Sequence, residues 1–505
     1  MLASPRLHPR FFHWAPLLLL ALADPVCAQS LGPPTDTLPT DAPPAKTDLG
    51  ILPDAFWRRD DIQRVVRDTL VDLQKEKSKP VAKDYEVGKQ VDFRVFWADG
   101  MQMETVDKAF RLHMGGLIHV DWGWWNADSA LMDAPGGVGP LEDGVRFRRA
   151  RMHMNGAMYE VVTWRMEVGF ETGAPNFFDV FAELPDLPFI GSWRIGHFRE
   201  PFGLDALTSY NNLTFTERGG VQDPFVPFFN MGTMIYGTLL DEHVTYATGI
   251  FGSNSDVAAI DFGDGRWAWT SRLTCAPWFD KDNGYAVHLG VAWSHRSLPL
   301  LDAAGKPDPN GKSRVIFASR PETRVNSPNF VNTGVITADT EDLVGAEFAA
   351  GLGPLLVQAE YMTALVPDAL APNGQPVPGT LMFRGFYVQA SWMMTGENRP
   401  YVRKEAIFGA ARPFENFFFV RGGPDKRDLL WGSGAWELAL RYTQLDLNSQ
   451  GVNGGDMRAL TFGINWYLNP RCRFLWDYLL TWRDAPPAGV SGLAQTFGAR
   501  FQIEF

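Results

Sequence analysis

Apolar and polar residues alternate with a period of two from about residue 91 to the C-terminus. In 112–124 nearly every second side chain is apolar or glycine, and 162–171, 285–294 and 460–468 repeat the pattern. Because successive side chains of a strand point to opposite faces, this alternation predicts many strands with one apolar and one polar face. Between them lie stretches such as "NSQGVNGGD" and "LNPR", whose Gly, Pro, Asn and Asp are typical of turns.

The length of these strands distinguishes two architectures, a soluble sandwich and a membrane barrel. Strands of globular proteins average about 5–6 residues and tilted membrane strands need about 9–11, whereas the alternating segments run for roughly 10–13. Charged side chains such as Arg165, Glu167 and Arg441 share strands with apolar faces. They would be costly in a dry core and are tolerated in a wet lumen. We therefore predict an all-β fold over residues 91–505, a transmembrane antiparallel β-barrel of roughly 15–18 strands, preceded by a short helix.

The C-terminal strand "LAQTFGARFQIEF" shows the two faces most clearly. Phe497, Phe501, Ile503 and Phe505 are expected to face lipid, and Arg500, Gln502 and Glu504 to face water in the lumen. The terminal Phe also resembles the signal that outer-membrane barrels present to their assembly machinery, which we expect as a partner.

The N-terminal part differs in composition from the strand-rich part. Residues 1–28 combine two arginines, an apolar run and a small-residue cleavage site, which predicts a secretory signal peptide. Residues 29–55 have the Pro-rich composition of a linker. Residues 56–80 show helical spacing, either as a periplasmic coiled-coil seam or as an amphipathic helix packed on its own chain. A signal peptide for export together with a transmembrane β-barrel predicts that the protein lies in the cell outer membrane.

Charge and motifs exclude several functional classes. The net charge of −12 argues against nucleic acid as a partner. A His-Glu-x-x-His helix and a Gly-x-Ser-x-Gly elbow are absent from the sequence, so we predict no enzyme and nominate no catalytic, cofactor-binding or metal residue.

Longer segments carry a family resemblance. The stretches "GVRFRRARMHMNG", "IGHFREPFGLDALTSYNNLTFTERG" and "FYVQASWMMTGENRPYVRKEAIFGAARP" resemble segments of the phosphate-selective porin O and P family of outer-membrane channels. The resemblance covers about 91–505. It implies a 16-stranded homotrimeric porin in contact with outer-membrane lipids, with a loop folded into the lumen, arginines along the path and small inorganic anions such as phosphate as permeants.

Seven arginines are candidates for lining that path. Arg149 and Arg151 match the family's pore arginines and lie opposite the apolar face of their strand; the other candidates are Arg165, Arg194, Arg199, Arg218 and Arg441. Each could instead be a lumen charge paired with a wall carboxylate. The sequence also departs from the family's Lys-rich cluster. The segment 199–230 has no Lys and contains two arginines but four carboxylates: Glu200, Asp205, Glu217 and Asp223.

Three hypotheses follow from these patterns. The first is a passive, water-filled channel for small solutes. The second is a non-channel barrel, an adhesin or envelope-structural protein with a plugged lumen, and the third is a barrel enzyme. The segments 200–230, 296–342 and 395–433 are long and are expected to be loops on the outer side.

Overall fold

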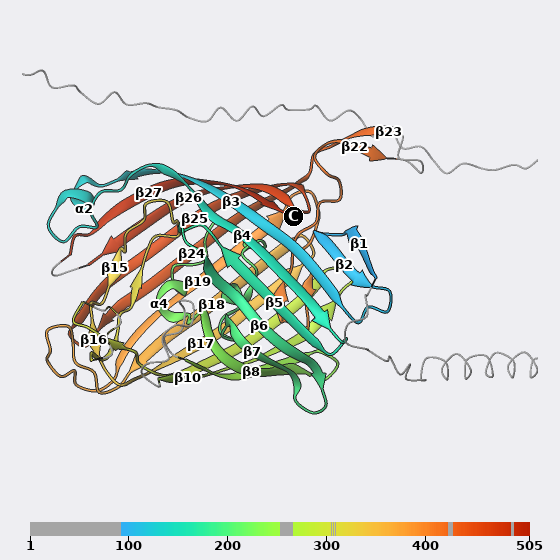
Figure 1. The fold of residues 1–505 in the computed structure, drawn as a ribbon. Coiled ribbons are helices and arrows are strands. Elements are labelled where there is room, and N and C mark those ends of the chain that lie inside the picture. The colour runs from blue at the N-terminus through green and yellow to red at the C-terminus, as the bar shows by residue number, and fades with distance from the viewer. Residues whose placement is uncertain are drawn as a thin grey trace, which may run out of the picture. The chain divides into compact units, whose positions relative to one another are not determined.

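The computed structural model describes residues 92–252, 266–304, 306, 308, 310–422, 428–485 and 489–505 (Figure 1). The chain divides into two units, and the second, Gln90–Phe505, contains all of these residues. The predicted signal peptide at 1–28, linker at 29–55 and helix at 56–80 lie outside the described residues. In the described part of the chain, no helix is long and apolar enough to cross a membrane.

Sixteen antiparallel strands form a closed barrel, as the alternation predicted. The strands are β3 (Arg111–Ala127), β4 (Gly144–Met158), β5 (Val162–Gly169), β6 (Asn176–Leu187), β7 (Gly191–Arg199), β8 (Phe229–Leu239), β9 (Val244–Gly252), β10 (Trp267–Asp280), β11 (Tyr285–Ser297), β17 (Thr340–Leu352), β18 (Leu355–Val366), β19 (Leu381–Met393), β24 (Ala435–Ser449), β25 (Val452–Asn469), β26 (Cys472–Asp484) and β27 (Gly492–Glu504). Each pairs with the next, and β27 closes the ring on β3 in a register that runs from Ala494↔Ala127 to Glu504↔Leu117. Closure leaves no free sheet edge in the ring.

The two ends of the barrel differ in their connections. At the end that holds the C-terminus, short turns such as 159–161, 353–354 and 470–471 join the strands; we call this the turn end. The opposite loop end carries 128–143, which includes α2 (Ser129–Asp133), and the long connections 200–228 and 298–339. A hairpin of β1 (Phe93–Trp97) and β2 (Met101–Thr105) pairs with the start of β3 at the turn end (Figure 1). Short turns face the periplasm in outer-membrane barrels.

The outer face of the barrel is apolar and carries aromatic rings near both ends. Trp436 stacks on Trp466 with ring centroids 5.1 Å apart near the turn end, and Trp124 lies 5.5 Å from Phe497 nearer the loop end. In the last strand, the side chain of Phe505 is 43% exposed on the outside, whereas Arg500 on the inner face is fully buried. The last strand thus has the predicted outer and inner faces, but Arg500 and Gln502 on the inner face are buried against the connection 200–228 and do not face water.

Two connections at the loop end fold into the lumen and bring the largest apolar cluster with them. The first, 200–228, contains α3 (Leu204–Leu207) and α4 (Gln222–Phe225). The second, 298–339, contains β12 (Leu300–Leu301), β13 (Lys312–Val315), β14 (Ala318–Ser319), β15 (Val331–Asn332) and β16 (Ile336–Thr337). Phe225 and Phe317 pack between the connections, and Phe383 and Leu445 extend the cluster to the wall.

The connection 394–434 lies at the turn end, so the expectation of an outer loop at 395–433 is wrong. It joins β19, which runs toward the turn end, to β24, which starts there beside Tyr467. Its hairpin of β20 (Tyr401–Val402) and β21 (Ile407–Phe408) is buried, and a second hairpin pairs β22 (Phe418–Gly422) with β23 (Asp428–Gly432). Conversely, a tight turn at 450–451 joins β24 and β25 at the loop end. The length of a connection therefore does not determine at which end of the barrel it lies.

Candidate functional site

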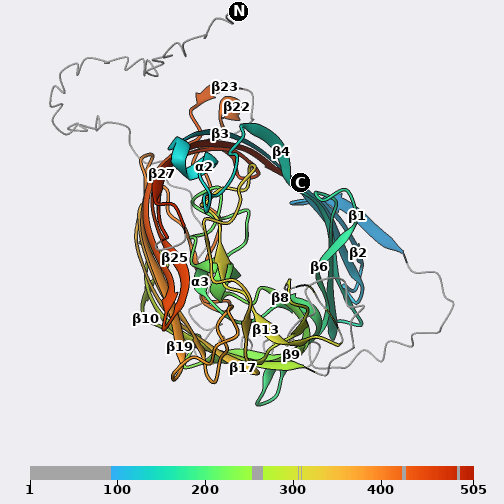
Figure 2. The same ribbon diagram turned by 90° about the vertical axis from the view of Figure 1, so that its left-hand side faces the viewer.

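The lumen is open along the wall from β3 to β10 and filled along the opposite wall. Two cavities of about 490 and 460 Å³ lie on the open side, and they share Arg165, Phe181, Glu183 and Arg194. Seen from the loop end, α3 and its neighbours lie inside the ring, nearer to β25 than to β6 (Figure 2). The shared lining makes the two cavities one continuous candidate path, and we take it as the functional site.

Arg165 on β5 borders both cavities. Strand alternation turns its side chain inward, and 34% of that side chain remains exposed. Its Nη2 lies 2.8 Å from Glu167 Oε2 and its Nε lies 3.6 Å from Asp179 Oδ2. Arg165 is therefore paired on the wall side and still accessible to a solute.

Arg194 on β7 is held in a similar way. Its Nη2 lies 2.7 Å from Glu183 Oε2 and donates to Tyr236 Oη at 3.1 Å. Its guanidinium carbon stands 4.0 Å from the centre of the Phe181 ring, a cation–π contact. With 24% of the side chain exposed, Arg194 presents a fixed charge to the path.

Arg199 and Arg218 meet at the entrance of the inward connection. Both donate to the carbonyl oxygens of Ala206 and Thr208, Arg199 at 2.8 and 3.3 Å and Arg218 at 3.3 and 2.7 Å. Burial, with the charge of Arg199 nearby, lowers the pKa of Arg218 to about 10, so it stays protonated at neutral pH. Arg199 borders the larger cavity, whereas Arg218 borders neither.

The lining of the two cavities carries more positive than negative groups. Six basic side chains border them, against four carboxylates: Arg111, Arg165, Arg194, Arg199, Arg272 and Lys404 against Glu104, Asp179, Glu183 and Glu405. Arg272 is also paired with Glu347, which borders neither cavity, at 2.7 Å. Fixed charge of one sign along a pore favours ions of the other sign.

Arg149 and Arg151 on β4 are 3% and 7% exposed and border neither cavity. Arg151 lies 3.0 Å from Glu167 and 2.7 Å from Glu171. Arg149 donates to His119 Nδ1 at 3.3 Å and covers the ring of Tyr210. Arg151 also stands 4.8 Å from the centre of the Tyr210 ring, so both arginines hold the wall to the connection 200–228.

A register shift in β4 adds an arginine that alternation alone would have placed outside. His119 pairs with Arg149 and Val120 with Phe147, so Arg148 is the extra residue of a β-bulge. Its Nε lies 2.6 Å from Glu217 Oε1 in the inward connection. Two consecutive residues, Arg148 and Arg149, thus point inward.

Arg441 on β24 is 2% exposed and belongs to the filled side. Its Nε and Nη2 donate to Glu322 Oε2 at 2.9 and 2.5 Å, and Glu322 also accepts from Thr443, Thr461 and the backbone N–H of Gly220. One carboxylate therefore joins the two inward connections to the wall.

Two further contacts with the wall, made by Arg500 and Glu360, fix the connection 200–228. The alternation along single strands could not identify which residues these two side chains contact. Arg500 on β27 donates to both oxygens of Asp121 at 2.6 and 2.7 Å and lies 3.0 Å from Glu217. Burial alone would raise the pKa of the Glu217 carboxyl, but Arg148, Arg149 and Arg500 outweigh it and hold that pKa well below its usual range. Glu360 on β18 accepts from the backbone N–H groups of Leu204 and Asp205 at 2.6 and 3.0 Å.

Comparison with known proteins places these features among porins. The family model described as phosphate-selective porin O and P matches residues 125–504. Porin O of Pseudomonas aeruginosa is 24% identical over 399 residues, which cover 73% of this chain and 82% of that protein. An uncharacterized protein of Caulobacter vibrioides is 24% identical over 422 residues, 81% of this chain and 77% of its own length.

Solved outer-membrane proteins resemble the chain more distantly. A loop-deletion form of OmpT from Vibrio cholerae has 10% identity and a TM-score of 0.45, covering 78% of this chain and 99% of its own. An anion-selective porin from Comamonas acidovorans has 10% identity and a TM-score of 0.44, covering 78% of this chain and all of its own.

Proposed function

This chain belongs to the phosphate-selective porin O and P family and is an outer-membrane channel, and on that premise we propose that its lumen favours small anions over cations. The observation that carries the proposal is the lining of the open side, with six basic side chains against four carboxylates. Inorganic phosphate, which the family's description names, is the permeant we propose to test first.

Arg165, Arg194 and Arg199 are the residues to which we assign the ion preference, because they border the open path. We assign Arg149, Arg151, Arg218 and Arg441 to holding the inward connections. A solute passing the first three meets partly exposed guanidinium groups, which bind oxyanions through paired N–H donors. Passage is passive, since the lining residues supply charge and hydrogen bonds and we assign no catalytic step to them.

The open cavities support a channel over a non-channel barrel with a plugged lumen. The two cavities have volumes of about 490 and 460 Å³ and are bordered by polar groups. Together they have room for hydrated ions.

We also propose that the protein assembles as a homotrimer, as its family membership suggests, in contact with outer-membrane lipids and after insertion by the barrel-assembly machinery. Cross-linking in native membranes tests the trimer; a monomer under those conditions would contradict it.

The reversal potential under a KCl gradient in a planar bilayer tests the ion preference. The expected sign is that of an anion-preferring channel, and added phosphate is expected to reduce the chloride current by competing for Arg165 and Arg194. A cation-preferring reversal potential contradicts the proposal. Folded protein that gives no conductance steps would contradict the channel itself.

A further inference from the structure

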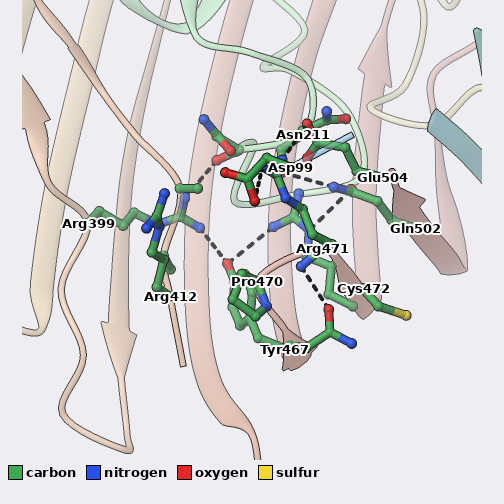
Figure 3. Close-up of a pocket in the computed structure, with 15 residues that line it drawn as sticks. Asp99, Asn211, Arg399, Arg412, Tyr467, Pro470, Arg471, Cys472, Gln502 and Glu504 are labelled. Atoms are coloured by element: carbon green, nitrogen blue, oxygen red, sulfur yellow. Dashed lines mark hydrogen bonds and ion pairs between the residues drawn. The ribbon is translucent and has the colours of Figure 1, made fainter. Parts of the chain in front are cut away.

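A small pocket at the turn end is separate from the conduction path. It has a volume of about 150 Å³ and none of its lining residues borders the two cavities described above. It lies where the inward connection, the strand wall and the connection 394–434 meet, with Asn211, Arg399, Arg412 and Arg471 among its lining (Figure 3).

Two of the four arginines around the pocket already have carboxylate partners. The Nε and Nη2 of Arg399 donate to Glu437 at 3.1 and 2.9 Å. Arg471 lies 2.8 Å from Asp99 and 2.9 Å from Glu504, the two acidic residues of the lining. The acidic groups of the pocket are therefore taken up by Arg471.

Arg473 on β26 is different, because it is buried without a carboxylate. It is 3% exposed, its Nε donates to Gln502 Oε1 and its Nη1 to Tyr467 Oη, both at 3.1 Å. Among the described residues, its Nη2 has no hydrogen-bond partner and no acidic group lies within ion-pair distance. A buried charge without a directly paired counter-charge is unfavourable, so an anion beside this guanidinium would stabilise it.

Arg412 supplies a second guanidinium at the same pocket that has no ion-pair partner among the described residues. Its side chain is exposed, and within the described part of the chain it makes no hydrogen bond or ion pair. In Figure 3 it approaches the pocket beside Arg399, across from Glu504 and Gln502. Guanidinium groups match the geometry of oxyanions with pairs of N–H donors.

We propose that this pocket binds a small oxyanion such as inorganic phosphate between Arg412 and Arg473. At about 30 Å³ per water, its volume equals roughly five waters, enough for a tetrahedral oxyanion and part of its hydration shell. The bound anion joins the connection 394–434 to the wall beside Asn211 and Asn212 of the inward connection. It therefore stabilises the turn end and does not lie on the conduction path.

The test measures phosphate binding by calorimetry and the unfolding midpoint of the folded protein in detergent, with and without phosphate. Because a ligand that binds the folded state stabilises it by mass action, we expect saturating phosphate to raise the midpoint by about 2 °C or more. Arg412→Gln is expected to abolish most of this rise and to weaken the pocket's affinity about tenfold, since it removes one of two charges. Lys281→Gln, which removes an exposed charge at the same end, is the matched control and keeps the rise.

A second pair of variants separates this pocket from the lumen. Arg194→Gln changes the path and is expected to keep the phosphate-dependent rise of the midpoint, whereas Arg412→Gln is expected to keep the wild-type reversal potential. Arg473→Gln should also lose the rise, and if it does not fold, the exposed Arg412 carries the test. A rise that survives Arg412→Gln, or a wild-type protein that phosphate does not stabilise, overturns the inference without affecting the proposed ion preference.

Discussion

The open and the filled sides of the lumen use the same kinds of ion pair for different purposes. On the open side, 34% of the Arg165 side chain and 24% of the Arg194 side chain are exposed beside their carboxylate partners. On the filled side, Arg441 and Arg500 are 2% and 0% exposed and are paired with acids of the inward connections or the wall. Access of water thus decides which arginines can meet a permeating ion and which hold the structure.

The largest effect is expected on the filled side, from Glu322→Gln. The substitution leaves the buried Arg441 without a counter-charge, and loss of one partner of a buried pair costs about 3–5 kcal/mol. Unfolding by urea in lipid vesicles measures this loss of free energy. Asp446→Asn is the control, because its partner Arg384 is 56% exposed and 3.9 Å away, and its expected cost is below about 1 kcal/mol. Equal losses in the two variants would remove the distinction between the sides.

The next largest effect is expected on the open side, from Arg194→Gln. It removes a positive charge from the lining and leaves Glu183 without a basic partner, so the anion-to-cation permeability ratio should fall by about 2- to 10-fold. Glu183→Gln removes the other half of the pair and should raise the same ratio. Reversal potentials of both variants measure the change; shifts of the same sign in both would contradict the role of this pair.

A smaller effect is expected from salt. The Debye length falls from about 10 Å at 0.1 M to about 3 Å at 1 M, so partly exposed charges such as Arg165 act over shorter distances. The anion-to-cation permeability ratio should move toward one as the salt concentration rises from about 0.1 M to about 1 M. In Arg194→Gln the same ratio should depend less on salt. A ratio that does not depend on salt would indicate that selection occurs at a dry constriction.

The smallest effect concerns pH and the carboxyl of Glu217. Its pKa in the folded protein lies well below the ordinary value of about 4.3. Its contribution to stability is therefore present above that ordinary value and is lost as pH falls through the lower, folded value. We expect the open-channel current to show the same noise at pH 7 and pH 5, whereas Glu217→Gln should raise the noise at both. If the current of the wild type became noisier between pH 7 and pH 5, Glu217 would not be the residue that fixes the connection 200–228 to the wall.

The alternation of single strands predicted much of the fold but not the direction of every connection. It indicated the barrel, the inner face that holds Arg149 and Arg165, and the two faces of the last strand. The segment 395–433 was expected outside because long connections are common there, yet it lies at the turn end. A shift of one residue at Arg148 was also invisible, since a bulge breaks the period of two without a sequence signal of its own.

The sequence by itself determined which side chains face lipid and which face the lumen, because that depends on the local geometry of each strand. Only the tertiary structure decided which lumen charges stay wet. Arg500 pairs with Asp121 on the neighbouring strand β3 and with Glu217, and Arg441 pairs with Glu322. The pairings with Glu217 and Glu322 arise where the inward connections pack against the wall. The same fold leaves Arg165 and Arg194 beside open space, because the described parts of the connections 200–228 and 394–434 border this cavity without filling it.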